Sequence, residues 1–224
     1  MSAVDVRESW ARVVGWCRAN APATAAAIQP AAGDEALRRA EEATGVSWPD
    51  DLRTWYSLAD GTERTPAGYA LPYYRPLPLD AVCAHWTMWQ EGWALIVAEI
   101  RREQEERDSR LRALGGPPVD PYDTGRLTAQ PAGTVAGMFL PSFVPIAEDQ
   151  AGADMFVDAR AGQLHGCVTE FLKGDADSHG PKWPSVAAML TDLAGGLEAL
   201  RPVGGWQPSV VDGRLDWHPA EPAQ

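Results

Sequence analysis

Apolar residues recur at intervals of three and four along much of the first hundred residues, which is the spacing of amphipathic helices. One such stripe covers residues 4–19, with Trp10 as its largest member. A second helix is expected to begin at an N-cap at Asp34 and to end at a left-handed cap at Gly45. Residues 20–33 between them are rich in Ala and Pro, which predicts a connection.

The stretch SWPDDLRTWYSLADG, residues 47–61, carries the start and stop signals of a third helix. Pro49 suits the first helical turn, the acids after it lie where the helix dipole favours negative charge, and Gly61 follows the last turn. Asp60 before Gly61 is typical of a tight turn. Residues 69–74 are then expected to form a short strand or an extended loop.

The longest helical pattern begins at Leu79, where apolar residues step by three or four as far as Ile100. The chain then becomes RREQEERDSRLR, so we expect one long helix that is buried in its first half and solvated in its second. Trp86, Trp89 and Trp93 lie on the apolar stripe. Tryptophans at helical spacing are usually core residues, and the wall of a ligand site is the alternative interpretation.

The pattern changes in the second half to short apolar runs separated by turn residues, which is typical of strands. Strands are expected at residues 143–147, 155–159 and 164–171. The first two are separated by the acidic turn EDQAGAD, which contains Gly152, and the last two by a turn at Gly162. This part of the chain is interpreted as an acidic hairpin followed by a further strand.

A last helix is expected at residues 186–200, and Asp212 with Gly213 between two β-like runs predicts a hairpin tail over residues 206–218. The order is therefore helices, then strands, then a helix and a hairpin. This order favours an α+β domain, with helices packed on one face of a mainly antiparallel sheet.

The whole chain, residues 1–224, is expected to be a single domain with its core at about residues 4–200. Within it, residues 115–141 show no periodicity and contain several Gly and Pro residues, which predicts a long loop that is mobile or partly disordered. The tripeptide Asp-Thr-Gly of aspartic proteases occurs once in this loop, at residues 123–125. That class needs two copies, each after an apolar strand, so the protease interpretation is disfavoured.

The composition is that of a folded protein, because 45% of the 224 residues are hydrophobic and 22% are charged. The formal net charge of -12 disfavours a nucleic-acid groove, which needs clustered positive charge. A basic protein partner would be favoured by complementary fields, and solubility is the alternative explanation of the charge.

The cysteines and the first residues indicate a cytoplasmic protein. Cys17, Cys83 and Cys167 are far apart and odd in number, so they are interpreted as reduced thiols or small core residues. The first residues lack the basic and apolar segments of a signal peptide. No stretch reaches the ~18 apolar residues of a membrane span, so no membrane partner is expected.

The acidic hairpin is the strongest candidate for chemistry. Asp149, Asp154 and Asp158 with His165 offer ligands for a hard divalent cation, but their spacing is not that of an EF-hand loop. His165 and Cys167 would share one side of a strand, whereas zinc needs two more ligands and a nucleophilic cysteine needs an opposed base. We therefore interpret these residues as strand residues that flank a hairpin.

Motifs of the common enzyme classes are absent from the sequence, including the nucleophile elbow, the Walker loop and the dinucleotide fingerprint. Adjacent carboxylates such as Glu41 and Glu42 diverge by about 100° on a helix and would not share a substrate. No catalytic, cofactor-binding or metal-binding residue is assigned, and neither a cofactor nor an enzymatic activity is expected.

Several short motifs occur in a characteristic order. They are E-x-x-x-G-x-x-x-P-x-D-L at residues 41–52, Tyr56, Asp60-Gly61, V-P-I at residues 144–146, an acidic turn with Gly152, V-D at residues 157–158 and G-x-V at residues 166–168. In this order they resemble the SUKH superfamily, specifically its Smi/Knr cell-wall-assembly-regulator family, over about residues 4–200. The resemblance implies an α+β fold with a curved, mainly antiparallel sheet and helices on its outer face.

The family signature maps onto scattered positions of this chain. They are Pro49, Asp60, Gly61, Pro145, Asp149, Gly152, Asp158, Gly166 and Val168. We interpret most of them as determinants of the fold, and Asp149, Asp154 and Asp158 as possible partner-facing residues. The family usually has a glycine-rich turn after V-P-I, whereas this chain keeps only Gly152, which argues against a tight backbone-lined site there.

The resemblance also implies a binding function. Fungal members look like hub regulators of cell-wall synthesis, bacterial members are typically immunity proteins that neutralise toxins, many of them nucleases, and none is known as an enzyme. Richness in Ala, Arg, Gly and Pro fits a bacterial genome of high GC content. The leading hypothesis is a cytoplasmic, non-enzymatic immunity-type protein with a basic toxin domain as partner. The alternatives are a regulatory hub of the cell-wall-assembly-regulator type and a metal-dependent hydrolase that uses the three aspartates and His165.

Overall fold

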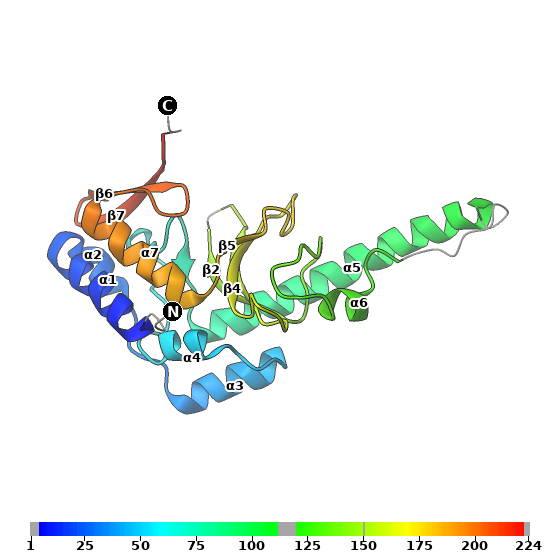
Figure 1. The fold of residues 1–224 in the computed structure, drawn as a ribbon, viewed down its shortest axis with the longest axis horizontal. Helices are drawn as coiled ribbons and strands as arrows, with labels where there is room; N and C mark the ends of the chain where they lie inside the picture. The colour runs from blue at the N-terminus through cyan, green and yellow to red at the C-terminus, as the bar shows by residue number, and fades with distance from the viewer. Residues whose placement is uncertain (1–4, 112–119, 150, 222–224) are drawn as a thin grey trace.

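The computed structural model describes residues 5–111, 120–149 and 151–221 (Figure 1). Its helices are α1 (Val6–Asn20), α2 (Pro22–Ala27), α3 (Asp34–Thr44), α4 (Asp50–Tyr56), α5 (Leu79–Leu111), α6 (Thr124–Thr128) and α7 (Val186–Ala199), with a 3-10 turn η1 (Pro66–Gly68). Its strands are β1 (Arg75–Pro76), β2 (Phe143–Glu148), β3 (Asp154–Asp158), β4 (Cys167–Phe171), β5 (Pro181–Trp183), β6 (Trp206–Val211) and β7 (Arg214–Pro219).

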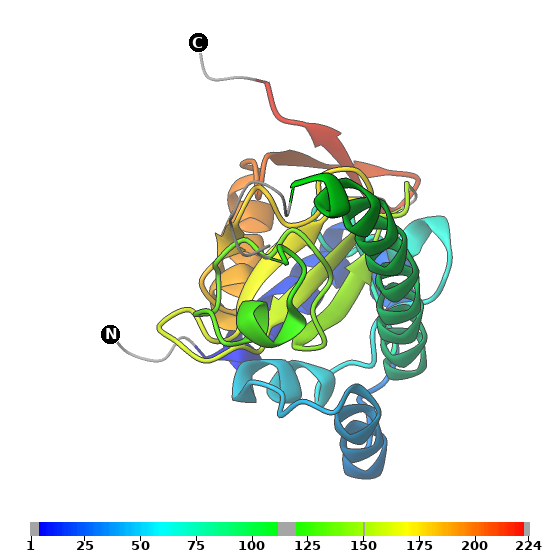
Figure 2. The same ribbon diagram turned by 90° about the vertical axis from the view of Figure 1, so that its right-hand side faces the viewer.

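The central sheet has five strands in the order β1-β2-β3-β4-β5, and each neighbouring pair is antiparallel. Successive residues of β3 point to opposite faces, so Met155 and Val157 join one buried cluster and Phe156 joins another. Helices α1, α4 and α7 contribute to the first cluster, whereas α5 and residues 120–142 cover the other face (Figure 2). The predicted α+β fold with an antiparallel sheet is confirmed, and β2, β3 and β4 correspond to the three predicted strands.

Helices α1 and α3 follow their predicted patterns. The buried side of α1 carries Val6, Ser9, Trp10, Val13 and Cys17. Trp10 packs edge-on against Trp55 of α4, with ring centroids 5.7 Å apart. Helix α3 ends at Gly45 with a left-handed φ of 67°, as predicted, whereas its N-cap is Gly33 and Asp34 is the first helical residue.

Residues 20–33 are more than the connection that their composition predicts, because they contain α2. Pro22 occupies the first turn of this helix, where a backbone N–H would have no hydrogen-bond acceptor within the helix, so its absence is not destabilising. The alanines that follow have the highest helix propensity. The same Ala and Pro residues that indicated a connection therefore form a short helix.

The predicted mobile loop at residues 115–141 contributes several buried side chains to the core. Residues 115–119 lie outside the described residues. The remainder contains α6 and buries Leu127 and Phe139. Apart from α6, these residues form turns and loop, as predicted. What the sequence did not predict is that long-range hydrogen bonds hold this segment against the sheet, because such contacts leave no local periodicity.

The turn between α4 and α5 is built around Asp60 and Gly61. Oδ1 of Asp60 accepts a hydrogen bond from the backbone N–H of Leu79 at 2.8 Å, so Asp60 caps the start of α5. Burial raises the pKa of Asp60, and the hydrogen bond from Leu79 acts in the opposite direction. Gly61 has a φ of 68°, and a Cβ atom there would lie 2.4 Å from the backbone nitrogen of Pro78. Glycine is therefore required at this position.

Helix α5 spans 33 residues and projects well beyond the sheet (Figure 1). Its stripe of Trp86, Trp89 and Trp93 packs against the second buried cluster. This agrees with the prediction that the first half of the helix is buried. The side chains of residues 104–111, which belong to the half predicted to be solvated, lie outside the described part. Among the described helices, none combines the length and the apolar character needed to cross a membrane.

Strands β6 and β7 form the predicted C-terminal hairpin. Asp212 and Gly213 at its tip have φ angles of 51° and 73°, the two consecutive left-handed residues that a tight hairpin turn requires. The hairpin packs against α2, where the backbone N–H of Leu215 donates to the hydroxyl of Thr24 at 2.8 Å. Nε1 of Trp217 also donates to the carbonyl of Tyr69 at 3.0 Å, so the hairpin is held on the body at more than one place.

Candidate binding groove

Asp154 opens β3 with a buried carboxylate, and only 2% of the residue is exposed. It accepts a hydrogen bond from Nε1 of Trp89 and lies 3.0 Å from Nδ1 of His85. Nε2 of the same imidazole lies 3.2 Å from a carboxylate oxygen of Glu148, which also pairs with Arg75. These groups form one polar network inside the fold that joins β1, β2, β3 and α5.

Sequence reasoning missed most of this network. His85 and Trp89 are one helical turn apart, which is a weak signal that both face the same partner. Arg75 and Glu148 meet only because they are directly opposed in the pairing of β1 with β2. The two-residue strand β1 was too short for its pattern to predict that pairing.

Asp158 ends β3 in a buried ion pair with Arg160. Nη2 of Arg160 lies 2.7 Å from Oδ2 of Asp158, and their side chains are 1% and 2% exposed. The same carboxylate accepts the backbone N–H of Gly133 at 2.8 Å, and the guanidinium donates to the carbonyl of Leu127 at 3.2 Å. The pair therefore fastens residues 120–141 to the sheet.

Asp177 fastens the next part of the same segment. Its two carboxylate oxygens accept the backbone N–H groups of Ala136 and Gly137, each at 2.8 Å, and the residue is 3% exposed. No local pattern predicts this contact, because the partners are 40 and 41 residues apart in the sequence.

The prediction that Asp154 and Asp158 face a partner does not hold, because both side chains are buried under α5 and residues 120–141. Asp149 is half-buried at the β2–β3 turn, where its Oδ1 accepts the backbone N–H groups of Ala151 at 2.7 Å and Ala153 at 2.8 Å. Of the three aspartates, Asp149 alone lines a surface cavity among those described below.

His165 and Cys167 do not form the pair that their spacing suggested. His165 lies in the turn before β4 with an exposed side chain, and its Nδ1 is 3.0 Å from the carbonyl of Arg160. Cys167 is buried, and burial raises the pKa of its thiol to about 11, as it raises that of Cys17 to about 12. Within the described residues, no group of three or more His, Cys, Asp or Glu side chains is arranged to hold a metal ion.

The other signature positions lie in turns and packing contacts of the fold itself. Gly166 has a φ of 86°, and a Cβ atom there would lie 3.2 Å from Cβ of Pro49, so these two signature residues pack together. Pro145 lies at the irregularity in the β2–β3 register, and Val168 is fully buried. Gly152 has a φ of 90° and open space around it, so its role is conformational.

Two adjoining cavities of about 350 Å³ and 150 Å³ form a surface groove that runs from the β2–β3 turn to the C-terminal hairpin. We call it the hairpin groove. It is lined by Arg64, Thr65, Pro66, Tyr69, Tyr73, Arg75, Glu148, Asp149, Arg214, Asp216 and Trp217. The two cavities share Pro66 and Tyr69 as lining residues, so they lie next to each other.

Tyr73 is held at the groove by an unfavourable backbone conformation. Its φ of 67° is left-handed, which costs an L-residue about 1–2 kcal/mol. Its ring stacks on Trp206 with centroids 4.2 Å apart and planes 3° from parallel, and 37% of the residue is exposed. Such strain persists only where the surroundings impose it, and it is concentrated at functional sites.

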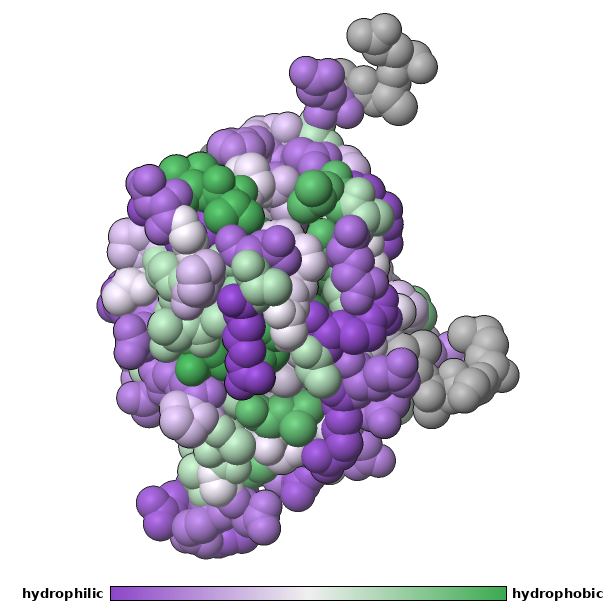
Figure 3. Space-filling view, turned by 90° about the vertical axis from the view of Figure 1, so that its left-hand side faces the viewer, coloured by the Kyte–Doolittle hydropathy of each residue, from purple (hydrophilic) through white to green (hydrophobic). Residues whose placement is uncertain are grey.

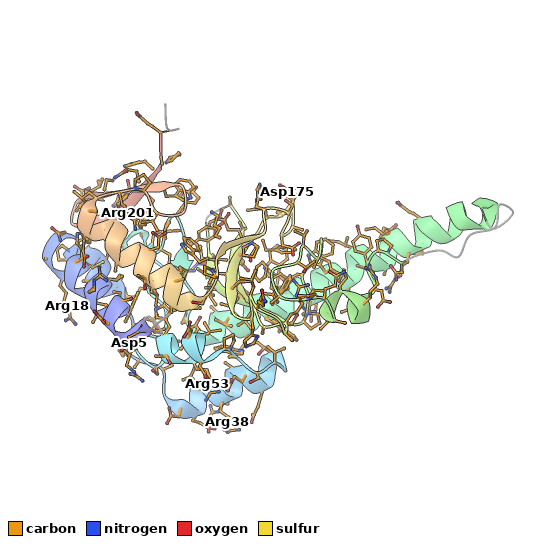
Figure 4. The ribbon with its side chains drawn as sticks, in the orientation of Figure 1. Asp5, Arg18, Arg38, Arg53, Asp175 and Arg201 are labelled. Carbon is orange, nitrogen blue, oxygen red and sulfur yellow. The ribbon has the colours of Figure 1, made fainter. Side chains whose placement is uncertain are left out.

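The charges of the groove are of both signs. Arg64 and Asp149 line the larger cavity, and Arg214 and Asp216 line the smaller one. Elsewhere, charged side chains are spread over different sides of the body, as Figure 4 shows for Asp5, Arg18, Arg38, Arg53, Asp175 and Arg201. In Figure 3, apolar side chains form separate patches within a largely hydrophilic face. The groove therefore combines aromatic side chains with charged groups of both signs.

Most of the predicted site acids form hydrogen bonds or ion pairs within the α+β domain, and the surface carries a groove with aromatic and charged side chains. This combination is typical of a binding module. Residues 31–192 match the family model of the SMI1 / KNR4 family (SUKH-1), and the chain belongs to this family. Domains of this family are generally non-enzymatic immunity or regulatory domains that bind protein partners. No curated protein matches the chain.

The family match is narrower than the span over which the motifs resemble the family, and it leaves α1, α2 and the β6–β7 hairpin outside. Arg214, Asp216 and Trp217 belong to that hairpin. One wall of the groove therefore comes from outside the matched family domain.

Proposed function

We propose that this protein is an immunity-type binding protein that neutralises a protein toxin, and that the hairpin groove is its binding surface. The observation that carries the proposal is Tyr73, which a left-handed backbone holds against Trp206 at the rim of an aromatic and charged groove. Tyrosine, tryptophan and arginine dominate the energetics of protein interfaces. Membership of the SMI1 / KNR4 family supports a protein as the partner.

The net charge of -12 supports a basic partner, because opposite fields raise the rate of encounter. A toxin that cleaves nucleic acid is one such partner, since its substrate-binding face must be basic. An acidic protein bound across that face excludes the substrate. The protein then acts in the bacterial cytoplasm without chemistry of its own.

Co-expression with the toxin encoded by a neighbouring gene tests the proposal, with growth as the readout. The wild-type chain is expected to restore growth and to form a stable complex with the toxin. The absence of a neighbouring toxin gene, or a failure to rescue growth, contradicts the toxin hypothesis. A stable complex with another cellular protein would instead favour the regulatory alternative.

Substituting Tyr73→Gly is expected to raise the dissociation constant of the complex about 30-fold or more, because it removes an anchor of hot-spot type. Glycine adopts the φ of 67° without strain, so the turn can keep its backbone conformation, and circular dichroism checks that the variant is folded. Isothermal titration calorimetry measures the change. Met88→Ala, on α5 and 51% exposed, is the matched control and should bind like the wild type. Equal affinities for the two variants would place the interface elsewhere.

Charge reversal at the hairpin wall tests whether the partner is basic. Asp216→Lys is expected to slow association about 3–10-fold at low ionic strength, whereas Arg214→Glu should leave the rate unchanged or raise it. Surface plasmon resonance at two salt concentrations measures both rates. The opposite order of the two variants would show that the groove meets an acidic surface.

A further inference from the structure

The smaller cavity of the hairpin groove is rich in flat rings. Three of its six lining residues are aromatic, namely Tyr69, Tyr73 and Trp217, whereas aromatic residues make up 8% of the chain. Pro66 adds a fourth ring to the lining. The volume of about 150 Å³ is below the ~300 Å³ at which cavities for whole drug-sized ligands begin, so it fits one or two rings of a longer ligand.

The aromatic residues of this cavity are held in place by the fold. The ring of Tyr73 stacks on Trp206 with the two planes 3° from parallel. Trp217 is 6% exposed, and its Nε1 donates to the carbonyl of Tyr69 at 3.0 Å, which ties the segment that carries Tyr69 to the hairpin. Tyr73 is 37% exposed and Tyr69 is half-buried, so both present surface to a ligand. Fixed rings favour a ligand that is itself rigid, because neither side then loses much conformational entropy on binding.

The hairpin does not offer a free strand edge at the groove. The N–H of Leu215 donates to the hydroxyl of Thr24 at 2.8 Å, so it points away from β6. Alternate residues of a strand share this direction, which places Trp217 and Pro219 next on the same edge. Pro219 has no N–H, so an added strand would meet a single main-chain donor, that of Trp217. A partner segment that binds by adding a strand to the hairpin is therefore disfavoured.

The larger cavity adds a negative charge that is fixed in place. Oδ1 of Asp149 accepts two backbone N–H groups, at 2.7 Å and 2.8 Å, and the side chain makes no ion pair with a described residue. Glu148 in the same cavity is already paired with Arg75, and Arg64 is 86% exposed and therefore screened by water. Asp149 is thus the lining carboxylate that remains available to a cation, and a basic residue of the partner complements it.

We propose that the hairpin groove binds a proline-rich segment of the partner in the polyproline II conformation, with a basic residue next to it. The prolyl rings pack on Pro66, Tyr69 and Tyr73, and the basic residue pairs with Asp149. Polyproline II has no internal hydrogen bonds, so its carbonyls are free to accept from the hydroxyl of Tyr73. Such segments bind in aromatic-lined grooves because they lose little entropy. This partner segment presupposes that the groove is the binding surface, as proposed above, but not that the partner is a toxin.

Isothermal titration calorimetry of the full-length protein with a synthetic peptide tests the proposal. The probe is a blocked hexaproline with one arginine at each end, so that either chain direction can place an arginine beside Asp149. The contact is small, and a dissociation constant of about 0.1–1 mM is expected. A matched peptide with alanine at every second proline should bind at least about tenfold more weakly, because it loses rings and rigidity. Equal affinity for the two peptides would overturn the proposal, since any extended basic peptide would then fit.

Three variants assign the contacts. Tyr73→Phe keeps the ring and removes the hydroxyl, so it should weaken binding of the arginine peptide about 2–10-fold. Asp149→Asn keeps an acceptor for the two backbone N–H groups and removes the charge. It should weaken the arginine peptide about 2–5-fold but leave a peptide with citrulline in place of arginine unchanged. Asp175→Asn, at a carboxylate between β4 and β5 that is 58% exposed, is the matched control and should bind both peptides like the wild type.

Equal binding of the arginine peptide by the wild type, Tyr73→Phe and Asp149→Asn would overturn the proposal. Its failure is distinguishable from failure of the toxin hypothesis. A toxin complex that Tyr73→Gly weakens, together with no binding of the proline peptide, would overturn the proline-rich segment and leave the groove as the toxin site. Peptide binding that Tyr73→Gly abolishes, together with no toxin that the protein neutralises, would support the segment and contradict the toxin hypothesis.

Discussion

Substituting Asp158→Ala is expected to lower the free energy of unfolding by about 3–5 kcal/mol. The change leaves the guanidinium of Arg160 buried without its counter-ion, and removal of one partner from a buried pair has a cost of this size. It also removes the acceptor for the backbone N–H of Gly133. Urea denaturation followed by circular dichroism measures the effect.

Two further variants test whether the loss of stability comes from leaving a buried charge unpaired. Asp175→Ala removes a carboxylate that is 58% exposed and should change stability by less than about 1 kcal/mol. The double variant Asp158→Leu with Arg160→Met replaces the pair by apolar groups and should recover much of the loss. Wild-type stability of Asp158→Ala would show that the pair does not hold residues 120–141 in place.

The same result bears on the hydrolase alternative. A metal-dependent hydrolase would lose its activity in Asp158→Asn while remaining folded. The structure instead ties Asp158 to Arg160 and Gly133, and Asp154 to His85 and Trp89. Asp154 and Asp158 are four residues apart on one strand, so their carboxylates are separated by about 13 Å. A loss of stability, and not a loss of activity in a fully stable protein, is therefore the expected consequence of substituting Asp158.

Sequence reasoning succeeded where structure is set by neighbouring residues. The left-handed cap at Gly45 and the turn at Asp212 and Gly213 were predicted because each depends on a few residues in succession. Residues 120–141 were not, because their order depends on the side chains of Asp158 and Asp177, which follow later in the chain. Contacts over 25 to 41 residues leave no periodicity in either partner.

The candidate site was predicted less well than the fold, and for a related reason. The acids of β3 were expected at the surface because only one face of the sheet was assigned a covering layer of helices. The tryptophan stripe of α5 could have predicted a second covering layer, since an apolar stripe of that size must pack against an apolar surface. In the structure it covers the face that carries Phe156, Asp154 and Asp158. The groove residues Tyr73 and Arg214 gave no signal, because they meet only after the hairpin has packed.

Substituting Gly61→Ala is expected to lower the free energy of unfolding by about 2–5 kcal/mol. A left-handed φ costs alanine about 1–2 kcal/mol, and the overlap of its Cβ with the backbone of Leu77 and Pro78 adds about 1–3 kcal/mol. The atoms in the way belong to the backbone just before α5, so they cannot rotate aside. Chemical denaturation measures the loss, and weaker capping of α5 by Asp60 should accompany it.

Two further glycines separate the contributions to this loss. Gly152 has a φ of 90° but open space around it, so Gly152→Ala should cost only the conformational part, about 1–2 kcal/mol. Gly15 lies within α1 with open space and an ordinary helical backbone, so Gly15→Ala should stabilise the protein by about 0.5–1 kcal/mol. The expected order of stability is therefore Gly15→Ala above the wild type, then Gly152→Ala, then Gly61→Ala. If Gly61→Ala were no less stable than Gly152→Ala, the close approach of Gly61 to Pro78 would not limit this turn, and the Asp60-Gly61 signature would need another explanation.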